Sequence, residues 1–260
     1  MNILMIGDVV GQPGRDAVRE LLPKMKKDHD IEFTIINGEN ASGGNSISPK
    51  GAEELFSSGA DVITTGDHIW KNKDIAPVLN EDPRILRPAN YPAGAPGTGY
   101  SVYLTSHGTM VAVVNLLGRV FMPPMDCPFK AMVKILNDVS SKTNIIILDF
   151  HAEATSEKKA MGWYLDGKVS CVVGTHTHVP TRDARILPCG TAYLSDLGMA
   201  GSEDSVIGVE REPVIKKFLT QLPVRFEPAK DNIWIHGAVV DINPDTGRAQ
   251  NIKMISEFYK

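Results

Sequence analysis

The chain has 260 residues, of which 42% are hydrophobic and 22% charged, and its formal net charge is -4. It is long enough to bury a substantial core, as one large domain or two small ones. This slightly acidic net charge argues against an extended basic surface of the kind that holds proteins on nucleic acid through phosphate contacts. A small nucleotide is still compatible with it as a ligand.

No stretch approaches the roughly 20 apolar residues needed to cross a bilayer, and the N-terminal "MNILMIGDVV" lacks the charged start and long apolar run of a signal peptide. We therefore expect a cytoplasmic protein without membrane contact. Cys127, Cys171 and Cys189 are odd in number and widely spaced, so neither a disulfide framework nor a thiolate zinc site is indicated.

The first third of the chain alternates between apolar runs and helical segments. The runs "NILMIGD", "FTIINGEN" and "DVITTGDH" are typical of strands that are covered on both faces. Helices are predicted between them over residues 14–27 and 48–59, where Ser48 suits the N-cap and Pro49 the first turn. This order predicts right-handed crossovers on a sheet.

The rest of the chain is richer in strands. Hairpins are predicted over residues 99–118, turning near "SHGT", and over residues 233–256, turning at "NPDTG". A helix over residues 128–141 and the strand-like runs "IIILDFHAE" and "CVVGTHTH" lie between the hairpins. No repeat or charge block suggests a linker, so we predict a single α/β domain over residues 1–260, with two sheets packed face to face and helices outside.

Five of the predicted strands end in metal-ligand or acid–base side chains. They are Asp8, Glu39 with Asn40, Asp67 with His68, His151 with Glu153, and His176 with His178. Each has an ordinary explanation when taken alone: an aspartate in a turn is often a helix cap, and a single histidine is often a satisfied core residue. Their repetition at strand ends framed by glycine favours one shared site.

The ligand types indicate which ions such a site would take. Three histidines together with carboxylates suit zinc, iron or manganese, whereas an oxygen-only set would suit magnesium or calcium. One catalytic ion needs about three protein ligands, and this set is larger. We expect two divalent or trivalent transition-metal ions that share a carboxylate, with iron or manganese favoured and zinc as the alternative.

Five motifs in order, "GDVVGQPGR", "NGENASGG", "GDHIW", "DFHAEATSEK" and "GTHTHVPT", resemble those of the calcineurin-like metallophosphoesterases, in their YmdB-like bacterial branch. The resemblance runs over essentially the whole chain. It implies a two-sheet sandwich flanked by helices (four-layer αββα), a dinuclear metal centre and a phosphodiesterase. It further implies that a hydroxide between the ions attacks a phosphate ester, with cyclic nucleotides of the 2',3'- or 3',5'-cyclic AMP type as substrates.

Carried over by position, the resemblance assigns ligands to both ions. It gives Asp8 and His178 to the first ion, Asp67, His151 and His176 to the second, and Glu39 to both as a bridge. The superfamily usually begins with D-x-H, but Val10 occupies the histidine position here, and in this branch Asn40 fills the gap. His68 matches the histidine that assists departure of the leaving group.

The family normally has asparagine at the position of Asp67, in a G-N-H motif. A third carboxylate would hold the ions more tightly and weaken their Lewis acidity. This residue keeps a second interpretation open: a regulatory protein that binds a nucleotide or metal at this site and acts through a partner with little turnover. A homo-oligomer is also compatible with the sequence.

Other polar residues in the motifs are weaker candidates. Glu153 and Glu157 are candidates for supporting the imidazoles from outside the ligand set. Arg87, Asn90 and Arg119 are candidates for phosphate contacts, with an internal salt bridge as an equal alternative for each arginine.

Overall fold

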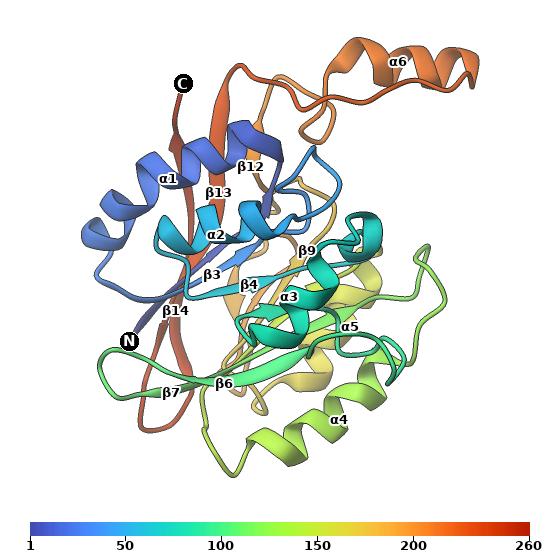
Figure 1. Ribbon diagram of the computed structural model, residues 1–260. Helices are drawn as coiled ribbons and strands as arrows, with labels where there is room; N and C mark the ends of the chain where they lie inside the picture. Colours follow the sequence, from blue (N-terminus) through green and yellow to red (C-terminus); the bar gives the residue numbers. More distant parts are fainter.

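The computed structural model describes residues 1–260 and shows two β-sheets packed face to face between helices (Figure 1). The larger sheet has eight strands in the order β2-β12-β13-β1-β3-β4-β5, with β14 paired to β13. Its strands are β1 (Asn2–Ile6), β2 (Asp8–Val9), β3 (Ile31–Asn37), β4 (Val62–Thr64), β5 (Ile85–Leu86), β12 (Met199–Ser202), β13 (Ile233–Ile242) and β14 (Ala249–Phe258).

The second sheet has six strands in the order β10-β11-β9-β8-β7-β6. They are β6 (Tyr100–Leu104), β7 (Met110–Leu117), β8 (Ile146–His151), β9 (Cys171–Thr175), β10 (Arg185–Ile186) and β11 (Ala192–Leu194). The helices are α1 (Gly11–Asp28), α2 (Pro49–Ser57), the 3-10 turn Ile69–Lys71, α3 (Ile75–Glu81), α4 (Pro128–Val139), α5 (Thr155–Leu165) and α6 (Arg211–Thr220). None of these helices combines the length and the hydrophobicity that a membrane-spanning segment requires.

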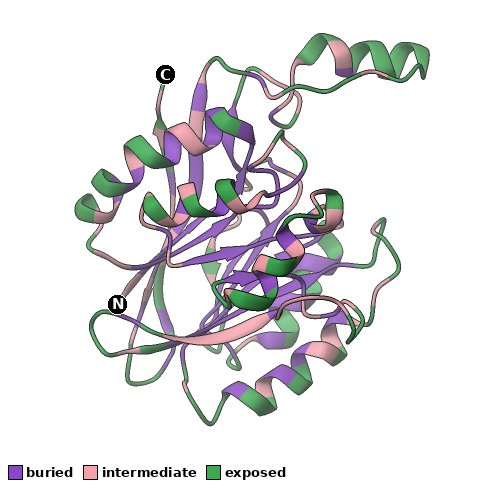
Figure 2. Ribbon diagram, viewed as in Figure 1, coloured by how far each residue is buried: buried purple, intermediate pink, exposed green.

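Alternation along the strands divides the apolar side chains among three cores. Ile3 and Met5 lie in the core between the sheets, whereas Leu4 and Ile6 lie in the core beneath α1 and α2. The third core joins the smaller sheet to α4 and α5. The central strands are buried, β6 and β14 are partly exposed, and the outer faces of the helices are exposed (Figure 2). The predicted four-layer αββα sandwich is therefore confirmed.

Most predicted elements are present. Ser48 Oγ accepts a hydrogen bond from the Gly51 N–H at 3.0 Å, which confirms the predicted N-cap of α2. Helix α1 begins at Gly11, three residues before the predicted start, and it contains Pro23. Both hairpins, β6–β7 and β13–β14, are antiparallel as predicted.

Three helices, α3, α5 and α6, were not predicted. Helix α6 buries only Val214, although Val214, Ile215, Phe218 and Leu219 recur at helical spacing, because the other three side chains stay exposed. It projects from the body of the molecule, at the upper right of Figure 1.

Parallel pairing places the ends of the site-bearing strands together. β1, β3 and β4 are parallel neighbours in one sheet, and β8 and β9 are parallel neighbours in the other. Parallel strands present their carboxyl ends at one edge, where open α/β sheets place their ligands. The loops that follow these strands therefore meet at one edge of the sandwich.

Candidate metal centre

The structure brings all eight predicted site residues together at this edge. They are Asp8, Glu39, Asn40, Asp67, His68, His151, His176 and His178. Asp8, Glu39 and His151 are fully buried, whereas His68 keeps about a third of its side chain exposed. The prediction that separate strand ends converge on one site is thus confirmed, and the metal-binding roles stay a proposal.

One group consists of Glu39, Asp67, His151 and His176, each with one donor atom within 4.8 Å of all the others. His151 Nε2 lies 3.1 Å from Glu39 Oε1 and 3.0 Å from His176 Nδ1. Glu39 Oε1 and Asp67 Oδ1 are buried and have no hydrogen-bond partner. Buried polar atoms are normally paired, so these two oxygens fit a cation between them and the imidazoles.

A second group adjoins the first and consists of Asp8, Asn40 and His178. Asp8 Oδ1 lies 3.5 Å from His178 Nε2 and 3.3 Å from Asn40 Nδ2. Asn40 Oδ1 faces His68 Nδ1 at 3.1 Å, so the amide would have to turn end for end to offer its oxygen to a cation in this group. Glu39 directly precedes Asn40, so one loop carries a residue of each group.

The protonation states of the side chains in the first group favour cation binding. Burial raises the pKa of Asp67, but the adjacent His151, whose Nε2 lies 3.5 Å from Asp67 Oδ1, outweighs burial and lowers it to about 2. Burial lowers the pKa of His151, but the surrounding carboxylates of Glu39, Asp67 and Asp8 outweigh burial and raise it well above the ordinary value. Burial and the adjacent His151 lower the pKa of His176 to about 4. Ionised carboxylates beside a neutral imidazole form a mixed N/O donor set that fits transition metals.

Three residues of this site have an unusual backbone environment. A Cβ at Gly66 would lie 2.2 Å from Glu39 Oε2 and 2.3 Å from His151 Nε2, so only glycine allows the end of β4 to pass this close. His176 and His178 have φ values of 97° and 63°, a region that residues other than glycine rarely adopt.

A buried ion pair supports the loop between those two histidines. Lys158 Nζ lies 2.6 Å from Asp196 Oδ2, and both side chains are almost fully buried. The same carboxylate oxygen accepts hydrogen bonds from the N–H and the hydroxyl of Thr177. Sequence reasoning missed this pair, because no local pattern connects residues 38 positions apart.

A cavity of about 850 Å³ opens onto the centre. Its lining includes Glu39, Asn40, His68, Lys71, His176 and His178, together with Val214, Lys217, Phe218, Gln221 and Phe226 from α6 and the segment after it. Phe218 and Phe226 are 75% and 40% exposed. The cavity therefore combines a polar, ligand-rich wall with lysines and accessible aromatic rings.

Glu153 and Glu157, the candidates for supporting the imidazoles, have different roles in the structure. Glu153 Oε2 lies 3.1 Å from His176 Nε2, so Glu153 contacts a proposed ligand. Glu157 is buried and accepts hydrogen bonds from the backbone N–H groups of Arg119 and Val120, which is a structural role.

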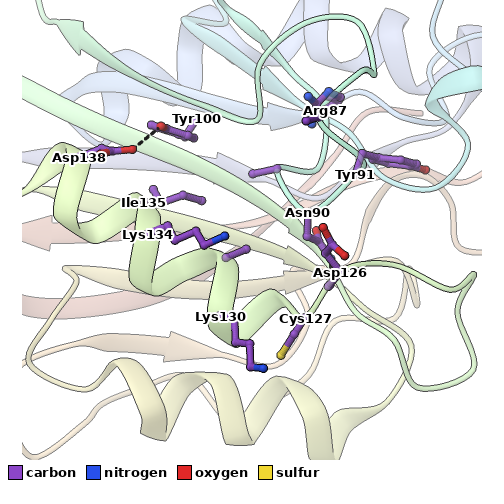
Figure 3. Close-up of a pocket in the computed structure, with 13 residues that line it drawn as sticks. Arg87, Asn90, Tyr91, Tyr100, Asp126, Cys127, Lys130, Lys134, Ile135 and Asp138 are labelled. Carbon is purple, nitrogen blue, oxygen red and sulfur yellow. Dashed lines mark hydrogen bonds between the residues drawn. The ribbon is translucent and has the colours of Figure 1, made fainter.

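Arg87 and Asn90 also have structural partners. The Arg87 guanidinium donates to three backbone carbonyl groups, and Asn90 donates to the carbonyl groups of Leu117 and Asp126. Both residues line a separate cavity of about 510 Å³, shown in Figure 3, to which none of the eight site residues contributes. The phosphate contacts for which both residues were candidates therefore have no support in the structure.

Comparisons with known proteins agree with this geometry. A family model described as YmdB-like protein matches residues 4–255. A Bacillus subtilis (strain 168) protein named 2',3'-cyclic-nucleotide 2'-phosphodiesterase is 50% identical over 98% of this chain and 96% of its own. A solved structure of a novel phosphatase from Mycoplasma pneumoniae is 32% identical over 99% of this chain and 93% of its own, with a TM-score of 0.92. The calcineurin-like phosphoesterase YfkN from Bacillus subtilis, at 10% identity and a TM-score of 0.60 over 99% of this chain and 90% of its own, shares the fold.

Proposed function

The chain belongs to the YmdB-like family of calcineurin-like phosphoesterases, and on this premise we propose that it is a metal-dependent phosphodiesterase that hydrolyses 2',3'-cyclic nucleotides. The proposal assigns the activity to one domain over residues 1–260. It places two ions, iron or manganese in preference to zinc, on the seven ligands predicted from the sequence. The cytoplasmic location and a homo-oligomeric state stay predictions.

The observation that carries this proposal is the pair of unpartnered carboxylate oxygens beside two imidazoles. Glu39 Oε1 and Asp67 Oδ1 are aimed at the same place as the ring nitrogens of His151 and His176. Without a metal ion, a proton on His151 would be the nearest positive charge to both buried anions. The cavity beside them has the volume for a nucleotide.

The chain's own side chains account for positioning and proton transfer. When bound, the ions supply Lewis acidity, which activates water and offsets negative charge on the phosphate oxygens. His68 lies at the mouth of the centre, with Nδ1 3.1 Å from Asn40 Oδ1, and is placed to give a proton to the departing ribose oxygen. Lys71 and Lys217 add positive charge to the cavity, and Phe218 and Phe226 offer faces for a nucleobase.

We expect the purified chain to bind two transition-metal ions and to hydrolyse 2',3'-cyclic AMP with added Mn²⁺ or Fe²⁺. Elemental analysis measures the stoichiometry, and a panel of 2',3'- and 3',5'-cyclic nucleotides, with bis-p-nitrophenyl phosphate as a generic ester, measures the activity. A chain that retains metal and binds nucleotide but turns over none of these esters would instead support the regulatory interpretation, which Asp67 favours.

Asp67→Asn is expected to move the rise of the pH–rate profile to lower pH, on the order of one unit, and to raise the rate at pH 7. Replacing a carboxylate by a neutral amide leaves more positive charge on the ion held there, which becomes a stronger Lewis acid. The pKa of Asp67 lies near 2, so at pH 7 the change removes a full negative charge.

The measurement requires saturating metal, because the variant is also expected to retain metal less tightly. Asp61→Asn, near the start of β4 and half-exposed, is the matched control for the same chemical change away from the centre. An unshifted profile at full metal occupancy would show that residue 67 does not ligate an ion.

A further inference from the structure

A second polar cluster lies behind the ligands, in the core between the two sheets. It consists of Asn37 on β3, Thr64 on β4, Asp149 on β8 and Thr175 on β9, and all four are at most 2% exposed. Asp149 is its centre: Oδ1 accepts from Thr175 Oγ1 at 2.7 Å, and Oδ2 accepts from Thr64 Oγ1 at 2.5 Å and from Asn37 Nδ2 at 3.0 Å.

The cluster contacts the proposed metal centre through one imidazole. Thr175 Oγ1 lies 2.9 Å from His151 Nδ1, the ring nitrogen that faces away from the other ligands. His151 Nε2 faces Glu39, Asp67 and His176. Nδ1 of this ring therefore contacts the buried polar cluster, and Nε2 contacts the proposed ligand group.

Counting protons determines the direction of each hydrogen bond. Donors face both oxygens of Asp149, and the Thr175 hydroxyl donates its single proton to Asp149 Oδ1. Thr175 Oγ1 then has only lone pairs to offer His151, so Nδ1 must carry the ring proton. A neutral His151 with its proton on Nδ1 has a free lone pair on Nε2.

The orientation of Asn37 follows from the same rule. The backbone N–H of Glu39 donates to Asn37 Oδ1 at 3.1 Å, which leaves Nδ2 to face Asp149 at 3.0 Å and Thr175 at 3.3 Å, with His151 Nδ1 farther away at 3.5 Å. Asn37, two residues before Glu39, is thus hydrogen-bonded to Asp149. Because Asn37 lies on β3 and Asp149 on β8, this hydrogen bond joins the two sheets beneath the proposed metal centre.

We propose that Thr175 and Asp149 are positioning residues that hold His151 in the tautomer with a free Nε2, ready to ligate a metal ion. This inference rests on the metal centre of the proposed function and adds residues that the ligand set does not contain. Groups that orient a ligating histidine in this way typically change metal affinity by about 10- to 100-fold when they are lost.

Thr175→Val tests the proposal, because valine keeps the shape of threonine and removes its hydroxyl. We expect Mn²⁺ to bind the variant about 10- to 100-fold more weakly than the wild-type chain, measured by competition with a chelator. Thr175→Ser restores the hydroxyl and should restore the affinity. Thr64→Val is the matched control, because it removes a donor from the same carboxylate without contacting His151.

The competing outcomes are distinct. Equal Mn²⁺ affinity in wild-type and Thr175→Val chains, or equal losses in Thr175→Val and Thr64→Val, would overturn the positioning role while leaving the metal centre intact. A wild-type chain that binds no Mn²⁺ would remove the proposed function as well.

A measurement on the unaltered chain keeps the proposal testable if the valine variant does not fold. In the Zn²⁺-loaded protein, nitrogen-15 NMR of the histidine rings should show His151 with a proton on Nδ1 and the metal on Nε2. Metal on Nδ1, or a Nδ1 without its proton, would overturn the assignment.

Discussion

Glu39→Gln is expected to abolish tight binding of at least one ion and to lower kcat/KM for 2',3'-cyclic AMP by roughly 10³-fold or more, equivalent to about 4 kcal/mol of transition-state stabilisation. Glutamine keeps the volume of the side chain but has no negative charge. It also places an N–H₂ group, which cannot ligate a cation, at one of the two positions that the carboxylate oxygens occupy. Elemental analysis and steady-state kinetics measure the two effects.

Glu53→Gln, on the exposed face of α2, is the matched control and should change neither property. A Glu39→Gln chain that keeps two ions and loses less than tenfold in rate would show that Glu39 is not the bridge.

His68→Ala is expected to lower kcat for cyclic nucleotides by roughly 10²- to 10⁴-fold, the usual range for general acid–base catalysis, while metal content stays nearly unchanged. His68 is one-third exposed and lines the cavity, and its ring contacts Asn40 and Glu39 from outside the four-residue ligand group. A ribose oxygen is a poor leaving group and needs a proton, whereas p-nitrophenolate needs little help. The loss should therefore be much smaller with bis-p-nitrophenyl phosphate.

The comparison of the two substrates separates proton transfer from metal binding. His107→Ala, on an exposed turn where the histidine contacts Glu32, is the matched control and should keep full activity. Loss of metal in His68→Ala would make His68 a ligand instead. Equal losses with both substrates at full metal content would remove the general-acid role.

The sequence by itself determined the local elements and the identity of the site residues. Strand β3 and the N-cap Ser48 were predictable because apolar runs, caps and turn residues act on neighbours within a few positions. The convergence of Asp8 and Glu39 was predictable as well, since parallel strands with crossover helices bring their carboxyl ends to one edge, whereas His151 comes from the second sheet and meets them through the stacking of the sheets.

Only the tertiary structure decided which side chains pair across that edge. Asp149 and Asn37 lie 112 residues apart, and no local pattern distinguishes their contact from ordinary strand residues. Packing also showed that Arg87 donates hydrogen bonds to three backbone carbonyl groups and that α6, most of whose apolar side chains stay exposed, forms part of the cavity wall. Such contacts depend on how the two sheets stack, because the side chains that meet between them come from strands distant in sequence.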